Sequence, residues 1–207
     1  MILHSVLSAL LLGVFALNAS QASAAGNKKQ KAQPIRVACV GNSITYGTGI
    51  EDRAHDSYPS QLQRMLGDKY VVGNFGKPGA TLLYHGRRPY VVQKEFKEAL
   101  AFKGDIAVIH LGINDTDPRN WPNYRDEFVK DYLSIMDSLR AANPKVRFIL
   151  ARMTPIADRH PRFISGTKLW HGEIQSAIET VARLSGAELI DFHEPLYPYP
   201  NLLPDAI

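Results

Sequence analysis

Short apolar runs alternate with amphipathic segments along the chain from residue 34 onward. Residues 35–40 are almost continuously apolar and rich in β-branched side chains, which is typical of a strand buried on both faces. Four more runs are of the same type, at residues 71–72, 106–111, 146–151 and 187–190. The pattern therefore predicts five buried strands.

Helical periodicity fills the intervals between these runs. Residues 57–66 and 91–102 are predicted to be helical, and apolar side chains three or four positions apart predict further helices within 124–139 and 170–184. Alternating strands and helices favour an α/β fold, a parallel sheet between helices joined by right-handed crossovers. Ligands of such folds bind beyond the carboxyl ends of the strands. The loops that follow the strands are therefore where we look for chemistry.

Composition excludes several classes of protein. The 207 residues are 45% hydrophobic and 21% charged, with a formal net charge of +4, which lacks the dense basic face of a nucleic-acid binder. The single cysteine, Cys39, lies in the first predicted strand, so neither a disulfide framework nor a cysteine-rich metal site is expected. No two histidines have metal-ligand spacing on a predicted helix. We expect neither a metal nor a cofactor.

The N-terminal segment resembles a secretory signal. An apolar block at residues 6–17, too short to span a bilayer, is followed by polar residues and by Ala22-Ser23-Ala24, which fits a small-x-small cleavage site. The domains we predict are a signal peptide over 1–24, a flexible basic leader over 25–34 and one globular domain over 35–207. The protein is expected to be periplasmic or secreted, with no membrane attachment after cleavage.

Three loops beyond predicted strands carry candidate catalytic groups. Ser43 comes just after the first strand, in Gly-Asn-Ser-Ile-Thr, where it is either an exposed nucleophile or a turn or helix-cap serine. Gly76 follows the second strand and allows a backbone N–H to approach a ligand closely. Asn114, in Gly-Ile-Asn-Asp, offers an amide donor after the third strand. A nucleophile and two oxyanion donors are what acyl transfer requires.

These three motifs, in this order, resemble those of the SGNH (GDSL-like) hydrolases. The resemblance extends from about residue 35 to the end of the chain and implies a flavodoxin-like three-layer sandwich with a five-stranded parallel sheet. It also implies that Ser43 is the nucleophile, and that the backbone N–H groups of Ser43 and Gly76 form an oxyanion hole with the Asn114 side chain. Asn42 stands where the family name has aspartate, at a position that is not catalytic.

The last family motif, Asp-x-x-His, is matched only at its start. Asp205 corresponds to the aspartate, and the expected histidine would follow Ile207. We therefore expect the catalytic domain to continue beyond residue 207, with a further C-terminal domain possible, and the given chain to be a poor esterase. Among internal histidines, His110 is expected to be a packed strand residue, and His193, after the fifth strand, is the best substitute base.

The substrate expected from the resemblance is an O-acyl ester, chiefly O-acetyl, on carbohydrate such as sialic acid or plant or host glycans. The motifs are similar to the N-terminal part of bacterial sialate O-acetylesterase-type proteins. The predicted substrate rim contains Arg87, Arg88, Trp121 and His193, although the two arginines are also consistent with solvated surface charges. A non-catalytic carbohydrate-binding module and a lysophospholipase or thioesterase remain alternatives.

Overall fold

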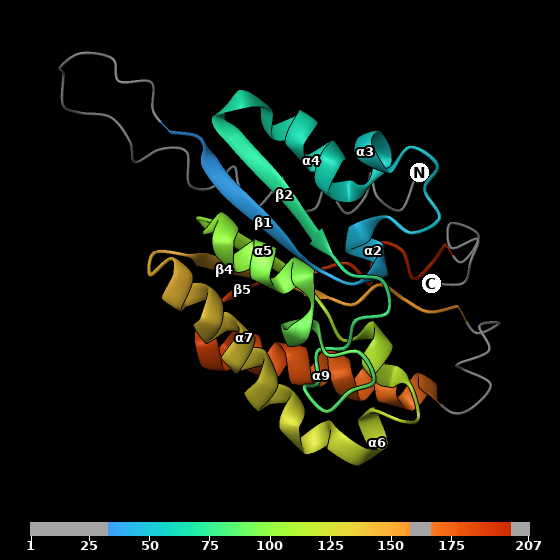
Figure 1. Ribbon diagram of the computed structural model, residues 1–207. Coiled ribbons are helices and arrows are strands. Elements are labelled where there is room, and N and C mark those ends of the chain that lie inside the picture. The colour runs from blue at the N-terminus through green and yellow to red at the C-terminus, as the bar shows by residue number, and fades with distance from the viewer. Residues whose placement is uncertain (1–32, 158–166, 200–207) are drawn as a thin grey trace, which may run out of the picture.

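The structure, a computed structural model, describes residues 33–157 and 167–199. Five parallel strands form one sheet in the order β2-β1-β3-β4-β5 (Figure 1). They are β1 (Ile35–Gly41), β2 (Tyr70–Gly76), β3 (Ile106–His110), β4 (Arg147–Arg152) and β5 (Glu188–Asp191). The predicted α/β fold with a five-stranded parallel sheet is confirmed. The predicted signal peptide, most of the predicted leader, and Asp205 lie outside the described residues.

Helices connect the strands at nearly the positions that the periodicity predicts. The longer ones are α4 (Tyr58–Leu66), α5 (Lys94–Phe102), α7 (Phe128–Ala142) and α9 (Thr167–Ser185). Short α-helical turns are α2 (Ser43–Tyr46), α3 (Arg53–Asp56) and α6 (Trp121–Tyr124), and 3-10 turns are η1 (Gly67–Lys69), η2 (Tyr90–Val92), η3 (Ile113–Thr116) and η4 (Arg125–Glu127). Within the described part of the chain, no helix is long and apolar enough to cross a membrane.

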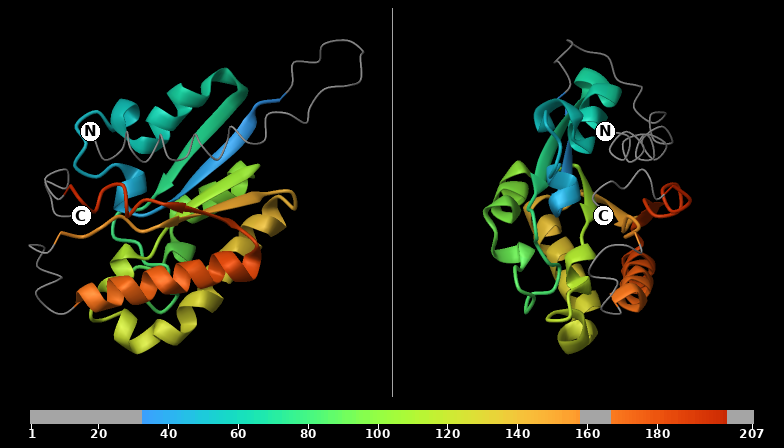
Figure 2. Two further views of the ribbon diagram at one scale, coloured as in Figure 1. Left: turned by 180° about the vertical axis from the view of Figure 1, so that it is seen from behind. Right: turned by 90° about the vertical axis from the view of Figure 1, so that its right-hand side faces the viewer.

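The sheet is covered by helices on both faces. The helices α5 and α7 contact each other, as do α7 and α9, whereas α4 packs on β2. The edge-on view in Figure 2 shows α4 and α5 on opposite sides of β1 and β2. This coverage explains the unbroken apolar run of β1, where residues 37–41 are all buried.

The strand order reverses direction at β1. The chain leaves β1 to form β2 on one side and then returns to place β3 on the other side of β1. A parallel sheet of this order has its topological switch point between β1 and β3, and ligands bind in the crevice beyond the carboxyl ends of the strands there. The loops after β1, β2 and β3 border this crevice.

Candidate active site

The carboxyl ends of β1, β2 and β3 are level with one another. Gly41, the last residue of β1, is paired in register with Gly76 of β2 and with His110 of β3. The N–H of Lys77, the first residue after β2, donates to the Gly41 carbonyl at 2.9 Å. The three candidate loops therefore leave the sheet side by side, at the switch point.

Ser43 is presented on a rigid turn directly after β1. The Asn42 side chain caps α2 by accepting a hydrogen bond from the Ile44 N–H at 3.0 Å. A Cβ on Gly41 would lie 2.0 Å from Thr45 Oγ1, so the close return of α2 over the strand end requires glycine. Asn42, Ile44 and Thr45 are buried, whereas Ser43 is partly exposed. The turn thus anchors its neighbours in the core and leaves Ser43 accessible.

Gly76 has a packing role that the sequence alone did not indicate. A Cβ there would lie 2.1 Å from the backbone nitrogen of Tyr46 in α2, so the glycine lets β2 and α2 touch. Its N–H donates to Asn74 Oδ1 at 3.0 Å and is therefore occupied in this structure. The role of Gly76 as an oxyanion donor stays a prediction. Gly79, three residues later at φ +76°, lines a pocket together with Asn114.

Asn114 lies in η3, the turn after β3, and is almost completely buried. Its Nδ2 donates to the carbonyl of Ala80 at 2.9 Å, which ties the amide to the loop after β2. The Asn120 side chain donates in turn to the Asn114 carbonyl at 2.9 Å. The loop after β2 therefore orients the Asn114 amide, and Asn120, later in the same connection after β3, fixes the Asn114 backbone.

Asp115 anchors the same two loops, and the sequence reasoning did not single it out. Its carboxylate oxygens accept hydrogen bonds from the N–H groups of Leu82 and Leu83, both at 2.9 Å. Burial raises the pKa of Asp115 to about 7, against the opposing effect of these backbone donors. An acid directly beside a candidate catalytic amide, after a fully buried strand, was the available signal.

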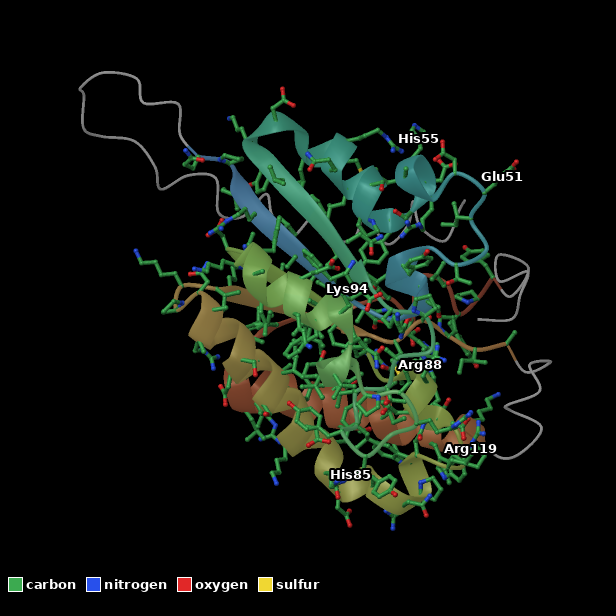
Figure 3. All side chains as sticks on the ribbon, viewed as in Figure 1. Glu51, His55, His85, Arg88, Lys94 and Arg119 are labelled. Carbon is green, nitrogen blue, oxygen red and sulfur yellow. The ribbon has the colours of Figure 1, made fainter. Side chains whose placement is uncertain are left out.

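A polar pocket of about 250 Å³ opens beside Asn114. Its lining residues come from the loops after β2 and β3 and are Gly79, Thr81, Arg87, Arg88, Asn114, Asp117, Arg119 and Asn120. Ser43 is not among them. Figure 3 shows Arg88 and Arg119 beyond the carboxyl ends of the strands, on the side of the molecule where α2 lies.

The residues predicted to form the substrate rim lie in different environments. Arg87 and Arg88 are exposed and line the pocket, and their role in a substrate rim stays a prediction. Trp121 is only 4% exposed, so its place on the rim is wrong. Its indole packs edge-on against Phe128 and donates its N–H to Glu173, because α6 docks on α7 and α9 instead of lining the pocket.

Three of the described histidines are buried or packed against other rings. His110 ends β3, is fully buried and packs on the Phe192 ring, as the sequence predicts for a strand residue. His193 follows β5 and stacks on Tyr197 at a ring-centroid distance of 5.1 Å, outside the lining of the polar pocket. His171 on α9 bonds through Nε2 to the Thr154 carbonyl, and burial lowers its pKa to about 4. Within residues 33–157 and 167–199, no cluster of three or more His, Cys, Asp or Glu side chains is placed to hold a metal ion.

Comparison with known proteins identifies relatives of this chain. It is 41% identical over 179 residues to an acetylxylan esterase of Xylanibacter ruminicola, covering 79% of this chain and 37% of that relative, so the chain spans well under half of the relative's length. The structure resembles that of the acetyl xylan esterase AlAXEase, with a TM-score of 0.59, 20% identity and coverage of 83% and 85% of the two chains. It also resembles Est24, a carbohydrate acetylesterase from Sinorhizobium meliloti, with a TM-score of 0.56, 17% identity and coverage of 76% and 83%.

The solved structures, at these identities, show a shared fold. The family is shown by sequence, because the model of the GDSL-like lipase/acylhydrolase family matches residues 39–207. That match includes the Ser43 turn, the loop after β2 and the Asn114 turn. With a matching family model, a relative above 30% identity and the same sheet, the chain belongs to the GDSL-like lipase/acylhydrolase family.

Proposed function

We propose that this chain is the catalytic domain of a serine esterase that removes O-acetyl groups from carbohydrate. The observation that carries the proposal is the register of β1, β2 and β3, which brings the Ser43 turn and the Asn114 turn to one edge of the sheet. The names of the relative and of the two similar structures, all esterases of acetylated carbohydrate, support the substrate class. Sialic acid as the acetylated sugar stays a prediction.

The proposed reaction begins with attack of Ser43 Oγ on the ester carbonyl. Serine is a weak nucleophile at neutral pH, so its proton must pass to a base, which we assign to the histidine expected after Asp205. The carbonyl π electrons move to oxygen, and that oxyanion accepts hydrogen bonds from the Ser43 N–H, the Asn114 amide and one glycine N–H, of Gly76 or Gly79. Collapse breaks the bond between the acetyl carbon and the sugar oxygen, which takes the proton from the base and leaves as a hydroxyl. Water then hydrolyses the acetyl-Ser43 ester to acetate and the free serine.

The loop after β2 has two glycines that could give the third donor. The Gly76 N–H already donates to Asn74, whereas Gly79 lines the pocket that contains Asn114. Gly79 at φ +76° adopts the left-handed conformation that favours glycine. We therefore propose Gly79 as the stronger candidate for this donor, with Gly76 supporting the contact between β2 and α2.

The test, made with the full-length protein, compares Ser43→Ala with Ser176→Ala, a control at an exposed serine on α9. Acetate release from acetylated xylo-oligosaccharides and from a chromogenic acetate ester should fall at least about a thousandfold in Ser43→Ala, because the nucleophile is lost. A serine-directed phosphonate should label Ser43 in the wild type, as read by mass spectrometry. Retained turnover in Ser43→Ala, or a label at another residue, contradicts the assignment. Glycan binding without any ester hydrolysis by the wild type favours a binding module.

We also propose that the protein is exported to the periplasm or beyond. The apolar block at residues 6–17 and the small residues of Ala22-Ser23-Ala24 support this. N-terminal sequencing of protein from the extracytoplasmic fraction should begin after Ala24. A cytoplasmic protein that retains Met1 contradicts the proposal.

A further inference from the structure

The polar pocket beside Asn114 contains an excess of positive charge. Three of its lining side chains are guanidinium groups, those of Arg87, Arg88 and Arg119, and only one is a carboxylate, that of Asp117. Arg119 is paired with this carboxylate, at 2.7 Å from its Nε and 2.5 Å from one terminal nitrogen. The single negative charge is therefore already compensated within the pocket.

The other two arginines have no such compensation. One terminal nitrogen of Arg88 donates to the Pro78 carbonyl at 3.0 Å, which positions the group without neutralising it. Within the part of the chain that the structure describes, the side chain of Arg87 forms neither an ion pair nor a hydrogen bond. Guanidinium groups bind carboxylates and phosphates in a planar, bidentate geometry. The pocket thus has two cationic donors available to an anion.

The backbone that carries these arginines is firmly held. The Thr81 N–H donates to the Arg88 carbonyl at 2.8 Å, and the Tyr90 N–H donates to the Thr81 carbonyl at 2.9 Å. These two bonds close the segment into a narrow loop. The loop backbone is therefore fixed before an anion binds, so that binding has to order the arginine side chains but not the backbone.

Asn120 links this loop to the proposed oxyanion residue. It is 1% exposed, its Oδ1 accepts a hydrogen bond from the Arg87 N–H at 3.0 Å, and its Nδ2 donates to the Asn114 carbonyl at 2.9 Å. One buried side chain therefore sets the position of the arginine loop relative to Asn114. A ligand group bound by the arginines is held at a defined place beside the oxyanion site.

The size and polarity of the pocket indicate what this group is. Its volume of about 250 Å³ is just below the range of roughly 300–1,000 Å³ found for sites of drug-sized ligands, and is suited to one sugar unit. Polar and charged side chains predominate in its lining, which disfavours a long acyl chain. In acylated glycans, the uronic and nonulosonic acids are the sugars that carry a carboxylate.

We propose that Arg87 and Arg88 form a carboxylate-recognition subsite, so that this esterase prefers O-acetylated glycans with an acidic sugar next to the ester. This inference rests on the proposed esterase function and specifies its substrate class. Arg119 contributes through its pair with Asp117, which shapes the wall of the pocket. The carboxylate accepts charge-assisted hydrogen bonds from the arginines while the acetyl carbonyl faces Asn114.

The test uses matched ligands that differ by one charge. An acetylated xylo-oligosaccharide with a glucuronic acid branch is compared with the same compound after reduction of its carboxyl group to an alcohol. The kcat/KM for acetate release should be about tenfold higher for the acidic form, since a charge-assisted hydrogen bond at a partly exposed site is worth about one decade in binding. An O-acetylated sialic acid and its carboxyl-reduced form distinguish a nonulosonic from a hexuronic acid.

The variant is the double substitution Arg87→Gln and Arg88→Gln, with Lys94→Gln as the control. Lys94 is an exposed cation on α5, paired with Glu98 and outside the pocket (Figure 3). The double variant should lose the preference for the acidic ligand, whereas Lys94→Gln should keep it. The wild-type preference should also shrink as salt rises, because the arginines are exposed.

Calorimetric binding of the deacetylated ligands separates failure of this inference from failure of the esterase proposal. An active enzyme with equal kcat/KM for acidic and reduced substrates, or an unchanged preference in the double variant, overturns the carboxylate subsite and leaves the esterase proposal standing. If no ester is hydrolysed, the esterase proposal fails and calorimetry alone decides. A preference for the acidic ligand that depends on Arg87 and Arg88 then still supports the subsite, and equal binding overturns it.

Discussion

Asp115 is a buried carboxyl group whose replacement tests how the loops of the site are held together. It is fully buried, and its two oxygens each accept one backbone hydrogen bond, from Leu82 and Leu83. Asp115→Asn keeps the shape of the side chain but turns one acceptor into an NH₂ group facing an N–H. A buried donor without an acceptor costs about 1–3 kcal/mol, which is the loss of stability expected under acidic conditions.

The loss of stability caused by Asp115→Asn should become smaller as pH rises. Burial raises the pKa of Asp115 from 3.8 to about 7, so between these values the folded protein keeps a proton that the unfolded chain has released. The stability that this group contributes is full below about pH 4 and is lost as pH rises through 7. At 1.36 kcal/mol per pKa unit, the wild type should lose on the order of 3 kcal/mol from this group between pH 5 and pH 8. Asparagine does not titrate, so the variant lacks this loss.

The assay is urea-induced unfolding of both proteins, followed by circular dichroism at pH 5 and at pH 8. The difference between the proteins is needed because His171, with a pKa lowered to about 4 by burial, has the opposite effect below its usual pKa of 6.5. Both proteins contain His171, so its effect cancels in the difference. The destabilisation of Asp115→Asn should be clear at pH 5 and close to zero or reversed at pH 8.

Asp137→Asn is the control, because Asp137 is 72% exposed and pairs with Arg140 on the same helix. The loss of stability in Asp137→Asn should stay below about 1 kcal/mol at both pH values. A destabilisation by Asp115→Asn that is equal at the two pH values, or larger at pH 8, refutes the reasoning. It would mean that the backbone donors outweigh burial and keep the carboxylate ionised throughout.

Three further substitutions test the arrangement of the site. Asn114→Ala should lower kcat by roughly a hundred- to a thousandfold with little change in KM, the usual loss of one oxyanion donor, and a rise in KM alone would make Asn114 a binding residue. Gly76→Ala should destabilise the fold by about 1–3 kcal/mol in thermal unfolding, because its Cβ would lie 2.1 Å from the Tyr46 nitrogen. Gly172→Ala, at an exposed position of α9 with nothing within 4 Å of its Cβ, should instead stabilise by roughly 0.5–1 kcal/mol. A stabilising effect of Gly76→Ala, or a destabilising effect of Gly172→Ala, contradicts the packing described.

Local periodicity was sufficient to predict the strands and helices. A parallel strand buried on both faces needs a continuous apolar run, and a helix on the sheet needs apolar side chains every three or four residues. Both signals lie in contiguous sequence, so β1, β3, β4 and the longer helices were predicted to within a few residues. The β2 strand was predicted only at residues 71–72, because its half-buried residues weaken the apolar run.

The sequence by itself also determined which loops carry the candidate chemistry. A serine, a glycine and an asparagine at the carboxyl ends of predicted strands lie at one edge of the sheet once the strands are parallel. The strand order is another matter, because the pairing of β1 with both β2 and β3 joins segments far apart in the chain. Only the tertiary structure decides it.

Contacts between loops cannot be predicted from the sequence alone either. Trp121 has an aromatic side chain of the kind that stacks on sugars, but it is buried, because α6 packs against α7. Asp115 and Asn120 are ordinary polar residues in the sequence, yet they connect the loop after β2 to the turn after β3. The contacts of Asp115 with Leu82 and of Asn120 with Arg87 each join residues 33 positions apart, and local sequence does not encode such distances. The sequence determined the elements and the chemical groups at their ends, and packing determined which groups share the pocket.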